Sequence, residues 1–156
     1  MKKWALLLAV GFVVFSGCDN EPVLSPAEQL AIDIQLIDQY VLDNNLSGFY
    51  TDGDVFISFD DEGTGTATPE STSTVEVVYR GTFLNGEEFD SSKGLSTEFA
   101  VYQVIAGWQD ALTHFKKGAS GTVIIPSKHA YGPRGRGSIP GDAVLIFELE
   151  LLDFRN

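Results

Sequence analysis

Residues 143–152, AVLIFELELL, show the pattern that decides the fold. In the second half of this stretch, apolar side chains alternate with glutamates, which is the period of a strand with one buried and one solvated face. The residues that would share the buried face are Ala143, Leu145, Phe147, Leu149 and Leu151. The sequence therefore predicts a long, half-buried strand here.

The same alternation recurs earlier in the chain. Residues 54–59 and 75–80 both alternate apolar with polar side chains, and residues 123–125 begin another apolar strand. The Gly-, Thr- and Ser-rich stretch 63–74 is typical of a loop, and Asn85-Gly86 is typical of a tight turn. These signals predict a sheet of several antiparallel strands.

A short helix is expected among these strands. Trp108, Leu112 and Phe115 would share one face of it, and Gly118 stands where such a helix would end. An antiparallel sheet covered by a single short helix belongs to the α+β class.

Another helix is predicted ahead of the strands. Ser25 can cap it, Pro26 suits its first turn, and Glu28 completes a capping box. The apolar residues that follow at helical spacing are Leu30, Ile34, Ile37 and Val41. We expect this helix to pack on its own domain; the alternative is that residues 26–46 join two copies in a weak dimer.

The first residues have the features of an export signal. Two lysines precede the apolar run Trp4–Phe15, which is too short to span a bilayer. Ser16-Gly17-Cys18 then resembles the lipobox of bacterial lipoproteins, in which the cysteine receives a lipid. We expect residues 1–17 to be a lipoprotein signal peptide and Cys18 to be lipidated. The alternative is an ordinary cleaved signal with Cys18 incidental.

This interpretation divides the chain into three parts. After the signal come a lipidated tether with the amphipathic helix, residues 18–48, and a domain over residues 49–156. The expected location is the bacterial cell envelope, with the lipid in a membrane and the domain facing the periplasm or the exterior. Inner and outer membranes fit the sequence equally well.

Composition excludes several classes of function. The net charge is −12, and loss of the two lysines in residues 1–17 takes it to −14, which disfavours binding to nucleic acid. One cysteine cannot form an internal disulfide, and two histidines, His114 and His129, cannot build a zinc cage. Sequence motifs for nucleophilic catalysis, phosphate binding and dinucleotide binding do not occur. An enzyme built on this chain would work without a nucleophile, a metal or a cofactor.

Four blocks of the sequence, taken together, resemble the FKBP-type peptidyl-prolyl isomerases over nearly all of residues 54–154. In chain order the blocks are VVYRGTFLNGEEFDSS (77–92), QVIAGW (103–108), HAYGPRG (129–135) and AVLIFELELL (143–152). The resemblance implies a sheet of five to six antiparallel strands wrapped around one short helix. It also implies an apolar active site between sheet and helix, and rotation of X–Pro bonds in exported proteins by non-covalent catalysis.

The resemblance assigns site residues by motif. Those expected to be catalytic are Tyr79, Phe89, Asp90, Ile105, Trp108, Tyr131 and Phe147. Those expected to bind substrate are Phe99, Val104 and Ile139. In the family, the backbone N–H matching Ile105 and the hydroxyl matching Tyr131 donate hydrogen bonds to carbonyls of the substrate or of macrolide inhibitors, and Trp108 forms the floor. Proline-containing polypeptides are the expected partners.

Two departures from the family pattern bear on this site. Leu95 replaces an arginine that pairs with Asp90 in some members, and the loop after Tyr131 is short and carries Arg134 and Arg136. Because the chain as a whole is acidic, we hypothesise that these two arginines favour polypeptide substrates that carry acidic residues.

Two further functions stay open: a binding module or holdase chaperone that uses the same pocket with little turnover, and a lipoprotein whose domain only docks partners.

Overall fold

The structure, a computed structural model, describes residues 24–156. The expected signal peptide and the lipidation at Cys18 lie outside the described residues. No helix within residues 24–156 is long and apolar enough to cross a membrane.

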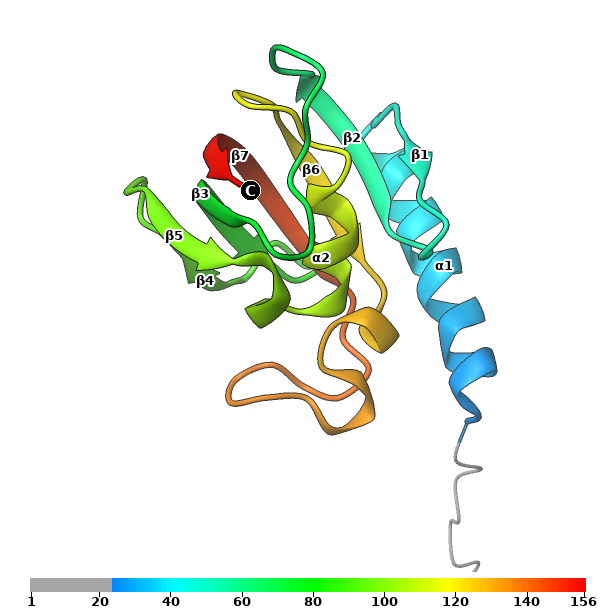
Figure 1. The fold of residues 1–156 in the computed structure, drawn as a ribbon. Coiled ribbons are helices and arrows are strands. Elements are labelled where there is room, and N and C mark those ends of the chain that lie inside the picture. The colour runs from blue at the N-terminus through cyan, green and yellow to red at the C-terminus, as the bar shows by residue number, and fades with distance from the viewer. Residues whose placement is uncertain (1–23) are drawn as a thin grey trace, which may run out of the picture.

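The core of the structure is one antiparallel sheet, as expected (Figure 1). Its strands are β1 (Phe49–Tyr50), β2 (Phe56–Asp61), β3 (Thr74–Thr82), β4 (Glu88–Ser91), β5 (Thr97–Ala100), β6 (Ser120–Ile125) and β7 (Leu145–Arg155). The order is β1-β2-β6-β7-β3-β4, with β5 also paired to β3. Because β4 pairs with the last residues of β3 and β5 with its first residues, the seven strands fill six positions across the sheet.

Within residues 24–156, two α-helices and three short 3₁₀ helices accompany the sheet. They are α1 (Pro26–Asp43), α2 (Ala106–Leu112), and the 3₁₀ helices η1 (Val101–Gln103), η2 (Ser127–His129) and η3 (Gly132–Arg134). The α+β class and the N-terminal helix are confirmed. The capping box at the start of α1 is present, since the Glu28 N–H donates to Ser25 Oγ at 3.3 Å and the Ser25 N–H donates to Glu28 Oε2 at 2.8 Å.

The first residues of β2 and β7 and the last residues of β6 are buried on both faces of the sheet. On one face Ile57, Val123 and Leu145 belong to the main core with α2. On the other face Phe56, Ile124 and Ile146 pack with Ile37 of α1 in a second cluster. This explains why the start of β7 is continuously apolar although its later residues alternate, since one face cannot hold neighbouring side chains of a strand.

The outer side of helix α1 is exposed to solvent. Ile37 is fully buried against the sheet, whereas Ile32, Leu36 and Leu42 face solvent. Figure 1 shows α1 running alongside β1 and β2, away from β4 and β5. A weak dimer through residues 26–46 stays a prediction.

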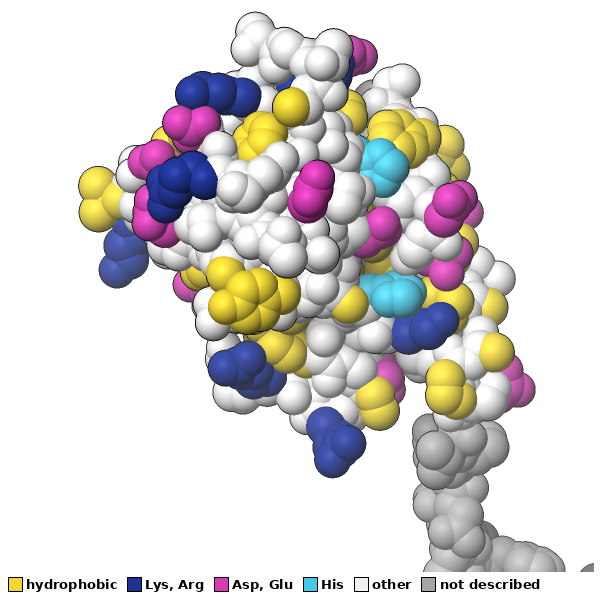
Figure 2. Space-filling view, viewed as in Figure 1, with side chains coloured by type: hydrophobic (Ala, Val, Ile, Leu, Met, Phe, Trp, Pro, Cys, Tyr) yellow, Lys and Arg dark blue, Asp and Glu magenta, His cyan; other side chains and the backbone are white. Residues whose placement is uncertain are grey.

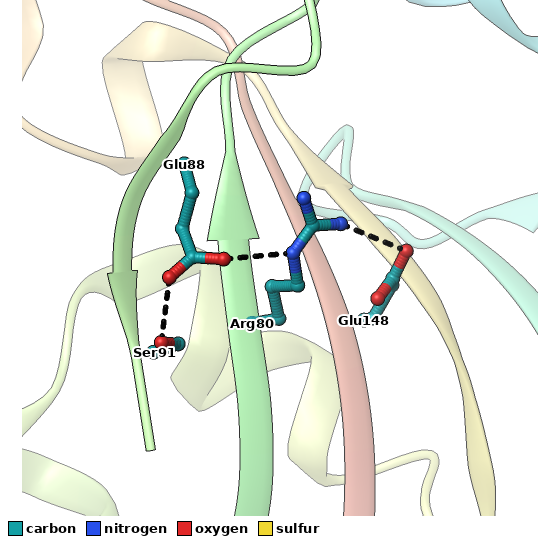
Figure 3. A network of polar contacts seen from close by, with 4 residues as sticks. All are labelled: Arg80, Glu88, Ser91 and Glu148. Atoms are coloured by element: carbon teal, nitrogen blue, oxygen red, sulfur yellow. Dashed lines mark hydrogen bonds and ion pairs between the residues drawn. The ribbon is translucent and has the colours of Figure 1, made fainter. Parts of the chain in front are cut away.

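The outer face of β3, β4 and β7 carries a polar network (Figure 3). Arg80 Nε lies 2.8 Å from Glu88 Oε2, and Arg80 Nη1 lies 3.5 Å from Glu148 Oε1. The Ser91 hydroxyl donates to Glu88 Oε1 at 2.7 Å. Ser91 and Arg80 together hold the pKa of Glu88 below its ordinary value. These groups are exposed, so the network adds little to stability.

Candidate active site

A cavity of about 200 Å³ opens where α2 faces β3, β4, β5 and β7. Its lining residues are Tyr79, Phe89, Asp90, Phe99, Gln103, Val104, Ile105, Trp108, Tyr131, Arg136 and Phe147. The structure thus brings together all the site residues expected from the sequence except Ile139. It adds Gln103, which the sequence motifs did not single out, and Arg136, which they placed near the pocket.

Trp108 forms the floor of this cavity, and several contacts hold its side chain in place. Its side chain is 4% exposed, and its ring stands edge-to-face with those of Tyr79, Phe99 and Phe147 at centroid distances of 5.3, 5.9 and 5.2 Å. Such edge-to-face pairs add to the stabilisation that comes from burial alone. The floor is therefore a rigid aromatic surface.

Gly107 allows α2 to approach the sheet closely enough to place this floor. A Cβ atom at Gly107 would stand 2.3 Å from Cγ2 of Ile125 in β6, a distance that no real contact shows. Any larger residue there would push α2, and with it Trp108, away from the sheet.

Phe89 and Phe147 form one wall. Their rings meet at 89° with centroids 5.6 Å apart, and Phe83 packs against Phe89 from the other side at 5.0 Å. Gly81 of β3 leaves room for this wall, because a Cβ there would lie 2.7 Å from the Phe89 ring.

Asp90 and Tyr79 form a polar pair at the rim. The Tyr79 hydroxyl donates to Asp90 Oδ2 at 2.9 Å. Partial burial, and then the Asp90 carboxylate, raise the pKa of Tyr79 to about 12, so the hydroxyl keeps its proton at neutral pH. Leu95, which stands where some family members have an arginine, is 70% exposed. The polar side-chain partner of Asp90 in this structure is Tyr79.

The backbone of Ile105 leaves a donor at the cavity. Ile105 precedes α2, and its carbonyl accepts from the N–H groups of Trp108 and Gln109 at 2.9 and 3.1 Å. Within residues 24–156 its own N–H donates no hydrogen bond. The N–H of Ile105 is therefore available to a ligand carbonyl.

The loop between β6 and β7 supplies Tyr131 and Arg136. The Arg136 guanidinium carbon lies 5.6 Å from the centroid of the Tyr131 ring, the geometry of a cation–π contact. Arg136 and Ile139 exchange backbone hydrogen bonds of 2.9 Å in both directions, which closes a tight turn. The Ile139 side chain packs against the same core as the cavity residues but is not among those that line the cavity, so its role in substrate binding stays a prediction.

A larger hollow of about 480 Å³ lies on the outer face of the sheet, with Arg80, Glu88 and Glu148 among its lining residues. These side chains are charged and open to solvent. This hollow is lined mainly by charged and polar side chains, whereas the smaller cavity is lined mainly by aromatic ones, which suit an apolar ligand group better.

Comparisons with known proteins show the family of the chain. Residues 65–152 match the family model described as FKBP-type peptidyl-prolyl cis-trans isomerase. The chain is 46% identical over 92 residues to the isomerase FkpA of Aeromonas hydrophila and 40% identical over 89 residues to FkpA of Escherichia coli strain K12. These matches cover 58% and 56% of this chain but only 34% and 33% of those relatives, so the chain spans about a third of their length.

Two solved structures share the fold. The crystal structure of FkpA from Escherichia coli aligns with a TM-score of 0.71 and 31% identity, covering 83% of this chain and 60% of that one. The crystal structure of a peptidyl-prolyl cis-trans isomerase from Pseudomonas syringae also gives a TM-score of 0.71, with 30% identity, covering 85% of this chain and 98% of that one.

Proposed function

Because this chain belongs to the family of FKBP-type peptidyl-prolyl cis-trans isomerases, we propose that it catalyses cis–trans rotation about X–Pro bonds in polypeptides. The observation that carries this proposal is the cavity floored by Trp108, where aromatic side chains from β3, β4, β5, α2 and β7 converge. No cofactor is part of the proposal.

The proposed mechanism is physical. Rotation about a peptide bond has a barrier of about 18–20 kcal/mol because the twisted bond loses amide resonance. A twisted amide has less charge separation than a planar one. An apolar cavity lined by Trp108 and Phe147 therefore favours the twisted amide relative to the planar ground state. This difference lowers the barrier without a covalent step.

Hydrogen-bond donors at the rim would orient the substrate. The free N–H of Ile105 and the hydroxyl of Tyr131 would donate hydrogen bonds to carbonyls of the polypeptide on the two sides of proline. The Tyr79–Asp90 pair keeps one edge of the cavity polar. Binding through main-chain carbonyls would let the site accept many different proline-containing clients.

A peptide isomerisation assay tests this function directly. The cis-to-trans rate of a proline tetrapeptide is followed with and without the protein, and again with an FKBP-binding macrolide. We expect acceleration that the macrolide abolishes. Macrolide binding without acceleration would instead support the second candidate, a binding module or holdase chaperone that uses the same cavity.

The clients are proposed to carry acidic residues near proline. Residues 126–141, which form most of the loop between β6 and β7, contain Lys128, Arg134 and Arg136 and no acidic residue. None of these three basic groups forms an ion pair within residues 24–156, and Arg136 reaches the cavity itself. A basic rim in an acidic protein would attract acidic polypeptide segments.

Attachment to a membrane of the bacterial cell envelope through Cys18 is proposed on the sequence alone. Labelled palmitate should enter the wild-type protein and not the Cys18→Ala variant, which should fractionate away from membranes. Incorporation of label into both proteins would contradict lipidation at Cys18.

A third proposed role is the docking of partners through α1. This role needs no turnover, so it stays open if the protein is inactive in the peptide isomerisation assay.

A further inference from the structure

Asp33 is a fully buried carboxylate in α1, on the face of the helix that packs against the sheet. Its neighbours on that face are apolar, among them Ile34 and Ile37. Within residues 24–156 it forms no ion pair. A buried carboxylate is costly unless hydrogen bonds satisfy its oxygens. Asp33 therefore depends on its hydrogen-bond donors.

Those donors come mainly from a segment 94 positions further along the chain. The backbone N–H and the hydroxyl of Ser127 both donate to Asp33 Oδ2, at 2.7 and 2.6 Å. Gln29 Nε2 donates to Asp33 Oδ1 at 2.8 Å. Both oxygens are thus satisfied, and Ser127 is itself 1% exposed.

Ser127 stands at the root of the loop that carries Tyr131 and Arg136. It is the first residue of η2. Its carbonyl accepts from the N–H of Ala130 at 3.0 Å, and Ala130 directly precedes Tyr131. Asp33 holds both donors of Ser127, so the start of η2 is anchored to α1. The aromatic ring and the guanidinium group at the cavity extend from that anchor.

We propose that Asp33 is a positioning residue for the active site. Through Ser127 it sets the position of η2, and thereby the position of the Tyr131 hydroxyl at the cavity rim. The N-terminal helix is then part of the framework of the site, in addition to any role as a tether or contact surface. This inference rests on the proposed isomerase function.

The choice of residue fits a positioning role. An apolar side chain at position 33 would match Ile37 and would avoid the cost of burying a charge. It would also leave two donors of Ser127 unpaired in the interior. A carboxylate at this position therefore selects one arrangement of η2 against α1.

Three variants separate positioning from packing. Asp33→Ala removes the acceptor of both Ser127 donors. Asp33→Asn keeps an acceptor oxygen toward Ser127, and its amide group can donate to Gln29 once the Gln29 amide turns over. Ile37→Ala is the matched control, because it removes buried packing one turn along the same helix without touching Ser127.

We expect Asp33→Ala to lower kcat/KM for a proline tetrapeptide roughly five-fold or more, measured well below its Tm. Asp33→Asn should stay within about two-fold of wild type, and Ile37→Ala should lower Tm but not kcat/KM. Wild-type kcat/KM in folded Asp33→Ala, or an equal loss in Ile37→Ala, would overturn the proposal.

Hydrogen–deuterium exchange gives a readout that needs no turnover. Amides of residues 127–136 should exchange faster in Asp33→Ala than in wild type, Asp33→Asn or Ile37→Ala. If Asp33→Ala does not fold, Ser127→Ala replaces it and should show the same acceleration to a smaller degree. Unchanged exchange would refute the positioning role. Absence of isomerase activity in the wild type would refute only the proposed function, and exchange would still decide the role of Asp33.

Discussion

The rings of Trp108 and Phe147 meet edge to face, with centroids 5.2 Å apart and planes at 84°. This contact joins α2 to β7, and Trp108 contributes the floor of the cavity while Phe147 contributes one wall. The two side chains therefore define the apolar surface on which a prolyl ring would rest. Loss of either should affect catalysis more than any other single change in the lining.

Trp108→Ala should lower kcat/KM for proline tetrapeptides roughly ten-fold or more, equivalent to about 1.4 kcal/mol of transition-state stabilisation. It should also destabilise the fold by about 3–5 kcal/mol, because Trp108 is buried. Phe115→Leu is the matched control, since Phe115 is fully buried in the same core but does not line the cavity. Equal kcat/KM in Trp108→Ala and wild type at a temperature where both are folded would remove the site assignment.

Arg136→Ala should reduce the preference for glutamate over lysine next to proline by about two- to five-fold at low salt. The reason is that Arg136 lines the cavity and forms no ion pair within residues 24–156. The preference of the wild type should fade as salt screens the charges. Arg80→Ala on the outer face is the control and should leave this preference unchanged. A preference that does not depend on salt would argue against an electrostatic origin.

Tyr79→Phe should change the pH dependence of stability in the alkaline range. The pKa of Tyr79 is raised to about 12 in the folded state, above its ordinary value of 10, so the folded protein holds this proton more tightly than the unfolded chain. The stabilising contribution is complete below pH 10 and falls as the pH rises toward 12. The difference in unfolding free energy between wild type and Tyr79→Phe should shrink over that window. Chemical denaturation at pH 8, 10 and 11 measures it, and a constant difference would contradict the raised pKa.

Ile37→Ala should lower the unfolding free energy by about 2–5 kcal/mol, because this side chain is fully buried between α1 and the sheet. Leu36→Ala, at the neighbouring exposed position, should change it by less than about 0.5 kcal/mol. Similar small effects for both variants would mean that α1 does not pack on the sheet in solution. Urea denaturation of the two variants makes the comparison.

The strands could be predicted because alternation is a local signal, whereas the residues that line the cavity followed from the resemblance to a known family. Alternation marks the second half of β7, and the motif that contains Tyr79 and Asp90 carries the residues of the rim. The continuous apolar start of β7 could have indicated more. Val144 and Ile146 do not fit a strand with a single buried face, and the second face they need is covered by α1.

Other features had no local signal. Asp33 and Ser127 are 94 positions apart, and an aspartate within an amphipathic helix is usually solvated. Arg136 reaches the cavity because of a tight turn in which Gly135 and Gly137 both have positive φ, at 62° and 60°. The same turn pairs the backbone of Ile139 with that of Arg136.

Burial of β7 between two helices has a consequence for the order in which the chain can fold. β7 pairs with both β3 and β6, yet it follows every other strand in the chain. α1 docks on residues contributed by β2, β6 and the start of β7, so the first helix to be synthesised finds its full binding surface only when the last strand emerges. Until then the part of this surface that β7 contributes is missing. A protein whose proposed task is to help other chains fold thus completes the packing of its own helix α1 only after β7 has been synthesised.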